Sequence, residues 1–281
     1  MNAPLTLQQA LEEAQDSLAL YSSARLDAEL LLCDVLQCDR SRLYITAHEE
    51  LQEEFMGRFR ALVKRRKSGT PVAYLTGARE FWSLPLNVDE NTLVPRPETE
   101  CLVERVLALV TSDATINIAD LGTGCGAIAI AIAVERPGCD ITATDISVSA
   151  LAMARKNAHQ HDIRNIRFRE GHWLEALDNT CEIIVSNPPY IRSDDKHLHT
   201  PEISHEPLLA LDGGVDGLTA IREIIRSAPA YLRPGGWLVI EHSYDQAGAV
   251  QKLLQQYAFI DIQTDHDYAG IERLTYACHD P

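Results

Sequence analysis

A cluster of three glycines stands between an expected strand at 116–121 and an expected helix at 126–135, in the stretch Ile118-Ala-Asp-Leu-Gly122-Thr-Gly124-Cys-Gly126-Ala. Glycine lets the backbone turn sharply and approach a ligand with no Cβ in the way. In a doubly wound sheet such a turn lies at the carboxyl ends of the strands, where nucleotide-like ligands bind. The spacing also satisfies G-x-G-x-x-A, so a dehydrogenase competes with other nucleotide-binding enzymes at this point.

Strands and helices alternate after residue 115. Short β-rich runs predict further strands at 140–145, 166–169, 182–186, 236–242, 258–264 and 272–278, and longer patterns predict helices at 147–160, 216–232 and 245–257. This alternation is typical of a mostly parallel sheet that helices cover on both faces. We therefore expect an α/β fold with a Rossmann-like, mostly parallel, seven-stranded sheet.

The first seventy or so residues follow a helical pattern. Thr6 and Gln9 fit a capping box, and apolar residues then recur near the helical period. From Thr70 on, prolines and glycines separate short aromatic and apolar runs, which suggests a hairpin-like linker. We expect a small all-helical N-terminal domain at 1–75, a β-hairpin linker at 76–97 and the α/β domain at 98–281.

The charge is unevenly distributed. The 281 residues contain 41 Asp and Glu against 25 Lys and Arg, a net charge of −16, and residues 81–281 hold 29 of the acids but 15 of the bases. This balance argues against a sequence-independent grip on a nucleic-acid backbone, which needs dense Lys and Arg. The basic run at 58–67 fits either a solvated helix face or a docking surface for an acidic or phosphate-bearing partner.

Three features predict a soluble, cytoplasmic protein. The longest apolar run is too short to cross a bilayer. The first residues, MNAPLTLQQALEEAQ, lack the pattern of a secretory signal. The seven cysteines include no CxxC pair and look like reduced thiols.

Two acids flank the glycine loop. Asp120 precedes it and could order the loop or meet a cationic ligand group; this favours S-adenosylmethionine over a dinucleotide, whose pyrophosphate needs clear access to the helix N-terminus. Asp145 ends the strand at 140–145 and can accept hydrogen bonds from both ribose hydroxyls, as such an acid also does in NAD enzymes. Asp145 therefore supports an adenosyl ligand without choosing which.

An apolar strand runs directly into Asn187-Pro-Pro-Tyr190. Two successive prolines fix φ and remove two N–H donors, which leaves a rigid turn with free carbonyls. The side-chain oxygen of Asn187 and the carbonyl of Pro188 can accept the two hydrogens of a planar –NH₂ group, and the ring of Tyr190 can pack against that group. The dehydrogenase interpretation leaves this turn unexplained.

Such a turn suits methyl transfer to an amide or exocyclic amino nitrogen. The lone pair of that nitrogen is delocalised, and hydrogen bonds accepted from both N–H groups bias it toward a tetrahedral geometry. Positioning this nitrogen in line with the methyl group can lower the reaction barrier by roughly 7–11 kcal/mol. We therefore assign no metal, covalent nucleophile or general base.

Further motifs extend along the chain: Pro71-Val-Ala-Tyr-Leu-Thr-Gly77, Arg79-Glu-Phe-Trp82, Leu93-Val-Pro-Arg-Pro-Glu-Thr-Glu100, Glu206-Pro207 and Tyr268-Ala-Gly-Ile-Glu-Arg273. With the glycine loop and the Asn-Pro-Pro-Tyr turn, they make essentially the whole chain resemble the HemK/PrmC family of release factor glutamine N5-methyltransferases. Asn-Pro-Pro-Tyr alone is shared with adenine and other amino-group methyltransferases.

This resemblance implies an S-adenosylmethionine-dependent methyltransferase that acts on the side-chain amide (N5) of the glutamine in the Gly-Gly-Gln motif of peptide-chain release factors and leaves S-adenosylhomocysteine. It implies catalytic roles for Asn187, Pro188 and Tyr190, which with Pro189 hold the glutamine. The implied cofactor-binding residues are Gly122, Thr123, Gly124, Cys125, Gly126, Asp145, Trp173 and Asn187. The helical domain is expected to help grip the release factor, and no stable nucleic-acid or membrane partner is expected.

One segment departs from the family's pattern. Family members usually carry an acid, expected near the adenine amino group, where this chain has His172 just before Trp173. A neutral histidine could still accept a hydrogen bond, and cofactor affinity would then depend on pH. The alternative is a surface histidine in a slightly shifted loop.

Other candidates stay open or weaker. His197 and His199 suggest a metal, but no further residues complete a zinc set. The polar segment 191–206 suggests a mobile loop over the substrate. Phe81 and Trp82 fit either a pocket lining or a staple between linker and domain. The competing functions are an N6-adenine DNA or RNA methyltransferase, which would need a basic groove, and a catalytically idle binding module, against which the intact Asn187 and glycine loop argue.

Overall fold

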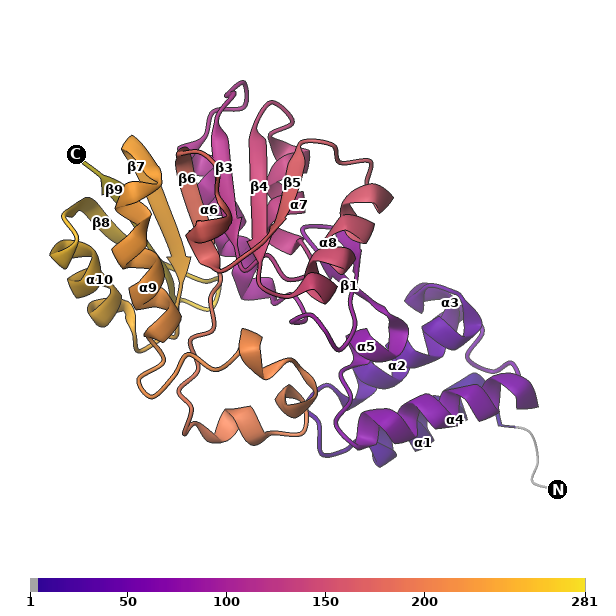
Figure 1. Ribbon diagram of the computed structural model, residues 1–281. Coiled ribbons are helices and arrows are strands. Elements are labelled where there is room, and N and C mark those ends of the chain that lie inside the picture. Colours follow the sequence, from indigo (N-terminus) through magenta and orange to yellow (C-terminus); the bar gives the residue numbers. More distant parts are fainter. Residues whose placement is uncertain (1–4, 281) are drawn as a thin grey trace. The chain divides into compact units, whose positions relative to one another are not determined.

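The computed structural model describes residues 5–280 (Figure 1), so the expectations made for residues 1–4 and 281 lie outside it. The chain divides into two compact units. The described parts of the helical unit are residues 5–78 and 200–205, and those of the α/β unit are residues 79–199 and 206–280.

The helical unit is built from α1 (Leu7–Ser17), α2 (Ala24–Leu36), α3 (Arg40–Ile45), α4 (Glu53–Lys67) and α5 (Val72–Thr76). The expected capping box begins α1, because the Gln9 amide donates to Thr6 Oγ1 over 3.3 Å and the Thr6 amide donates to Gln9 Oε1 over 3.0 Å. The apolar faces of α1, α2 and α4 form one core, which includes Leu11, Leu31 and Phe59.

Arg66, on α4, lies inside this unit rather than on the solvated or docking face expected for the basic run at 58–67. Its side chain is 2% exposed and pairs with Asp27 of α2, with 2.7 Å between Nε and Oδ2. The guanidinium stacks on the ring of Tyr21, 3.7 Å from the ring centroid, and also pairs with Glu202. A guanidinium can be buried here because two carboxylates and an aromatic face replace its water.

Residues 200–205, which lie within the segment 191–206 that suggested a mobile loop over the substrate, form part of the helical unit. Pro201 packs so closely on Gly69 that a Cβ there would meet the Pro201 carbonyl oxygen at 2.5 Å. Gly69 can also adopt its φ of +105° without strain. Short 3₁₀ turns at Lys196–His199, Ile203–His205 and Leu208–Ala210 organise the surrounding segment.

The α/β unit contains the expected seven-stranded sheet, in the order β5-β4-β3-β6-β7-β9-β8 (Figure 1). Its strands are β3 (Asn117–Leu121), β4 (Asp140–Asp145), β5 (Ile166–Glu170), β6 (Cys181–Ser186), β7 (Leu232–Glu241), β8 (Phe259–His266) and β9 (Glu272–His279). Only β9 pairs antiparallel, with β7 and β8, so the mostly parallel fold class is confirmed.

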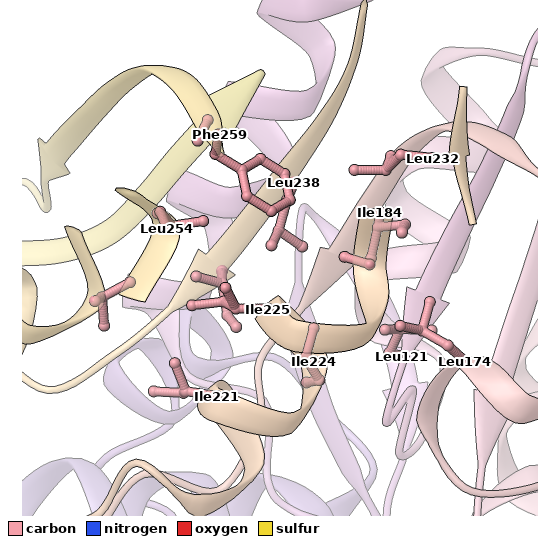
Figure 2. Packing of buried hydrophobic residues seen from close by; sticks show 14 of the residues in the cluster. Leu121, Leu174, Ile184, Ile221, Ile224, Ile225, Leu232, Leu238, Leu254 and Phe259 are labelled. Atoms are coloured by element: carbon pink, nitrogen blue, oxygen red, sulfur yellow. The ribbon is translucent and has the colours of Figure 1, made fainter. Parts of the chain in front are cut away.

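Helices α6 (Glu100–Leu109), α7 (Ala127–Glu135), α8 (Val148–Gln160), α9 (Thr219–Ser227) and α10 (Ala247–Gln256) cover the sheet. Figure 2 shows Ile221, Ile224 and Ile225 of α9 packed toward Leu238 of β7 and Ile184 of β6. Each such fully buried side chain contributes about 1.5–3 kcal/mol relative to an exposed one. Alternate residues of β6 and β7 therefore point away from α9, toward the second face of the sheet.

Two element boundaries differ from the prediction by four residues or more, and the other strand and helix ends of the sheet domain by three or fewer. The helix expected at 216–232 ends at Ser227, and a 3₁₀ turn at Ala228–Ala230 follows, because Pro229 cannot donate to a continuing helix. Strand β7 begins at Leu232 rather than at 236, since Cys181 of β6 pairs with Leu232 across a bulge that precedes the regular ladder.

The segment expected as a linker packs on the α/β unit. Strands β1 (Ala78–Phe81) and β2 (Leu84–Asn87) form a two-stranded sheet, whose turn residues Trp82 and Ser83 have φ of 54° and 57°. Two positive φ values suit a tight hairpin but strain residues other than glycine. The Trp82 amide donates to Glu100 over 2.8 Å and its indole donates to Glu135 over 2.9 Å, which holds the turn in place.

Candidate active site

A cavity of about 400 Å³ opens at the carboxyl ends of β3, β4 and β6. This volume lies in the range of small-molecule sites, and the edge of the sheet is where open α/β folds bind ligands. Six residues singled out from the sequence line it: Gly122, Gly124, Asp145, Trp173, Asn187 and Pro189.

Asp145 fixes the glycine loop at one wall of the cavity. Its Oδ2 accepts from the Gly124 amide over 2.9 Å, and its Oδ1 accepts from the Ser147 amide over 2.8 Å. Burial raises the pKa of this carboxyl, while the amides of Ser147 and Gly124 oppose the shift. A carboxylate has about four acceptor sites, so Asp145 can still accept a hydrogen bond from a ligand.

Asp120 lies beneath the loop and is fully buried. Its Oδ2 accepts from the Thr123 hydroxyl over 2.6 Å and from the Ala129 amide over 3.2 Å. Burial raises its pKa to about 7, and Oδ1 has no hydrogen-bond partner in the structure. Of the two roles considered for Asp120, these contacts are those of a residue that orders the loop.

Trp173 forms the wall beyond Asp145, with an unusual φ of 47°. Its carbonyl accepts from the Thr144 hydroxyl over 3.0 Å, which ties this backbone to the end of β4. The neighbouring His172 also lines the cavity, and its Nδ1 lies 3.4 Å from Oε1 of Glu223 on α9. The cavity therefore has an aromatic wall with a histidine–carboxylate pair at its edge.

The Asn-Pro-Pro-Tyr turn begins where β6 ends. Asn187 is half-buried and faces the cavity, while its Nδ2 donates to Thr99 Oγ1 over 3.1 Å. The Tyr190 hydroxyl donates to Oε1 of the buried Glu241 over 3.0 Å. These hydrogen bonds hold the turn at Asn187 and at Tyr190. The side-chain oxygen of Asn187, Oδ1, takes no part in the hydrogen bond to Thr99.

Five other residues singled out from the sequence do not line the cavity: Thr123, Cys125, Gly126, Pro188 and Tyr190. At Gly126 a Cβ would lie 3.0 Å from Ile130 and 3.1 Å from Ala154, so this glycine permits close packing of α7 and α8. Burial raises the pKa of the Cys125 thiol to about 12, which makes it a poor nucleophile. Phe81 and Trp82 also lie away from the cavity lining.

Two domain families match the chain: the PrmC N-terminal domain over residues 9–77, and the methyltransferase small domain over residues 98–206. A release factor glutamine methyltransferase of Coxiella burnetii is 46% identical over 275 residues, which cover 97% of this chain and 99% of that protein. A second, from Xylella fastidiosa, is 47% identical over 252 residues, which cover 89% of this chain and 92% of that protein. The chain belongs to the release factor glutamine methyltransferase family.

Membership of this family confirms both the resemblance inferred from the motifs and the enzyme class. Among solved structures, a methyltransferase from Pyrococcus furiosus superposes with a TM-score of 0.54 at 16% identity, covering 70% of this chain and 90% of that one. At that identity the likeness shows the fold alone.

Glu206, which the sequence marked only as part of the Glu206-Pro207 motif, is buried, accepts from the Val94 amide over 3.0 Å and pairs with Arg96. It thus joins this motif to the Leu93–Glu100 motif. Two other residues near the site were missed in the sequence. In the sequence, Glu223 lies within an expected helix and Glu241 near the end of an expected strand, and neither belongs to a motif. Only the folded sheet brings Glu241 next to the Asn187 turn.

Within residues 5–280, no three His, Cys, Asp or Glu side chains are grouped so that they could hold a metal ion. None of the helices described there combines the length and apolar composition that a bilayer crossing requires.

Proposed function

We propose that this protein transfers a methyl group from S-adenosylmethionine to the side-chain amide nitrogen, N5, of the glutamine in the Gly-Gly-Gln motif of peptide-chain release factors. The observation that carries the proposal is the shared cavity, where Asn187 and Pro189 face Gly122, Gly124 and Asp145. An acceptor for a planar amide and a glycine cradle for a nucleoside thus open onto one space. The family and the names of its members point to the same reaction.

The residues that line the cavity suit S-adenosylmethionine. Gly122 and Gly124 have φ of 71° and 56°, and a Cβ at Gly124 would meet no protein atom within 4 Å. We assign cofactor binding to the loop Gly122–Gly126, to Asp145 for the ribose hydroxyls, to Trp173 for the flat face of the adenine and to Asn187. The bound cofactor supplies a methyl group on a sulfonium, which needs no activation by the protein.

The protein's own contribution is to orient the glutamine amide. We assign Asn187 Oδ1 and the carbonyl of Pro188 as acceptors for its two hydrogens, with Pro189 and Tyr190 shaping the turn. Acceptance of both hydrogens favours the geometry in which the nitrogen lone pair is available. Orientation of this kind can contribute roughly 7–11 kcal/mol, so we assign no general base.

We assign recognition of the release factor to the helical unit, together with the α/β unit around the cavity. The exposed basic residues of α4 offer a surface for acidic groups: Arg58, Arg60, Lys64, Arg65 and Lys67. Cytoplasmic location follows from this substrate, because peptide release occurs on ribosomes.

Mass spectrometry of the Gly-Gly-Gln peptide tests the proposal, after incubation of a bacterial release factor with the protein and S-adenosylmethionine. We expect a gain of one methyl group on the glutamine, loss of that gain with Asn187→Ala, and an unchanged gain with Asn179→Ala, a matched variant of an exposed asparagine. Methylation of adenine in DNA or RNA, without methylation of the release factor, would refute the proposal in favour of an N6-adenine methyltransferase.

A further inference from the structure

A buried carboxyl group lies beside the Asn-Pro-Pro-Tyr turn without a role in the chemistry above. Strands β6 and β7 are parallel neighbours, with Ser186 in register with Ile240, so Asn187 and Glu241 are the next residues at the same edge of the sheet. Glu241 is 1% exposed. Its Oε1 accepts from the Tyr190 hydroxyl, whereas no donor reaches its Oε2 with normal hydrogen-bond geometry.

Thr99 connects this carboxyl group to Asn187. It ends the 3₁₀ turn Pro97–Thr99 that leads into α6, and it is buried. Its Oγ1 accepts from Asn187 Nδ2 over 3.1 Å, so the hydroxyl hydrogen remains to be donated. Within the described part of the chain, Glu241 Oε2 is an acceptor without a partner, and Thr99 lies close enough to lower the pKa of that carboxyl, although no hydrogen bond of normal geometry joins the two side chains.

The direction of these contacts decides which face of the Asn187 amide meets the substrate. The two ends of an asparagine amide have nearly the same shape, so only hydrogen-bond partners distinguish its two orientations. An ionised carboxylate can only accept. A Thr99 hydroxyl that donates its hydrogen toward Glu241 is left as an acceptor for Asn187.

We propose that Thr99 and Glu241 are positioning residues, which hold the Asn187 amide with Nδ2 turned toward Thr99 and Oδ1 turned toward the cavity. The inference rests on the proposed function, since only the oxygen can accept a hydrogen from the –NH₂ group of a substrate glutamine. In the flipped orientation the Nδ2 hydrogens of Asn187 would face the –NH₂ hydrogens of the substrate glutamine, so the substrate would lose its acceptor.

The surroundings of Glu241 make this device sensitive to protonation. Burial raises its pKa to about 7, opposed by Thr99, Tyr190 and the positive charge of Arg273 on β9, while Glu98 adds to the increase. Burial raises the pKa of the Cys101 thiol on α6, and Cys101 also lies close enough to Glu241 for the negative charge of that carboxylate to raise this pKa further. A protonated Glu241 can donate as well as accept, and it then no longer selects one orientation of the Asn187 amide.

Variants of Thr99 separate the hydroxyl from the packing. Thr99→Val keeps the shape and removes the hydroxyl, whereas Thr99→Ser keeps the hydroxyl. We expect Thr99→Val to lower kcat on the release factor by about tenfold or more, with a much smaller change in the Kd of S-adenosylhomocysteine by calorimetry. Thr99→Ser should recover most of the lost kcat. Equal kcat values for the wild type and Thr99→Val, or equal losses for both variants, would overturn the inference.

Glu241→Gln tests the second link, because an amide can donate to Thr99 and reverse the direction of its hydroxyl. We expect a loss in kcat similar to that of Thr99→Val, and no further loss in the Thr99→Val/Glu241→Gln double variant, since both act through one amide. The decline in kcat below about pH 7 that Glu241 causes should disappear in Glu241→Gln. Additive losses would show that the two residues act separately and would refute the inference.

A spectroscopic measurement gives an answer that does not depend on activity. The side-chain ¹⁵N–H₂ signals of Asn187, assigned by their loss in Asn187→Ala, should show slow hydrogen exchange in the wild type and fast exchange in Thr99→Val. Unchanged exchange would overturn the inference even if a variant were too unstable for kinetics. If the wild type methylates no release factor at all, the proposed function fails instead, so the two failures are distinguishable.

Discussion

The benzene ring of Trp173 lies directly against Gly122: a Cβ at that glycine would stand 3.0 Å from Cζ3 of the ring. Both residues have a positive φ, of 47° at Trp173 and 71° at Gly122. A strained backbone position, Trp173, therefore lies next to a glycine that adopts a positive φ without strain, at one wall of the cavity. Strain of this kind persists only where the surrounding structure holds it, and it concentrates at binding sites.

Gly122→Ala should weaken cofactor binding through this contact. The methyl group would push the Trp173 ring away, and alanine at this φ adds about 1–2 kcal/mol of backbone strain. We expect the Kd of S-adenosylhomocysteine, measured by calorimetry, to rise by about tenfold or more. Gly57→Ala is the control, because Gly57 lies on α4 with no atom near its Cβ position, and it should leave this Kd unchanged.

The His172–Glu223 pair predicts that cofactor affinity depends on the charge at the edge of the cavity. His172→Asp would set two carboxylates near 3.4 Å apart there, and their repulsion would displace side chains that line the cavity. We expect this variant to bind S-adenosylhomocysteine several-fold more weakly than the wild type, as measured by calorimetry. The His172→Asp/Glu223→Gln double variant should recover most of that loss. Tighter binding by the single variant than by the wild type would contradict the prediction.

Asp120 predicts a loss of stability toward neutral pH. Its pKa is about 7 in the folded protein because of burial, with a smaller contribution from Asp145, against a usual value of 3.8. The folded state therefore retains a proton that the unfolded chain has released, so the associated stability is complete below about pH 4 and is lost as the pH rises through about 7. Asp120→Asn should make Tm depend less on pH between 5 and 7.5. The exposed Asp113→Asn should keep the wild-type slope.

Removal of the Arg66 charge should destabilise the helical unit. Arg66→Met would leave the buried Asp27 without its partner, at a cost of about 3–5 kcal/mol. The Arg66→Met/Asp27→Asn double variant should recover part of this loss. All three tryptophans, Trp82, Trp173 and Trp237, lie in the α/β unit. Tryptophan fluorescence should therefore keep its wild-type urea transition, while a transition seen only by circular dichroism moves to lower urea.

Local patterns predicted the sheet because each strand carries its own signal. The apolar run at 182–186 and the glycine loop at 122–126 define a strand end and a helix start without reference to distant residues. Asp145 was found for the same reason, since an acid at the end of a parallel strand has a fixed place relative to the loop. The site residues within a few positions of these signals could be named from the sequence.

Distant pairings could not be predicted in this way. Glu241 is 54 residues from Asn187, and only the register of β6 and β7 makes them neighbours. Arg66 sits in a basic run that looks like a solvated face, and its burial depends on Asp27 and Glu202. The hydrogen bond between Thr99 and Asn187 was hidden for the same reason, because the two residues lie 88 positions apart in the sequence.

Because residues 200–205 belong to the helical unit, the coding segments of the two units alternate along the gene. On the ribosome, residues 5–78 emerge long before Glu202 and Pro201, so Arg66 and Gly69 lack these partners until most of the α/β unit has been synthesised. A recombination event between residues 78 and 79 would transfer the helices without the segment that completes them. Inheritance of the two units as one block is the expected evolutionary result.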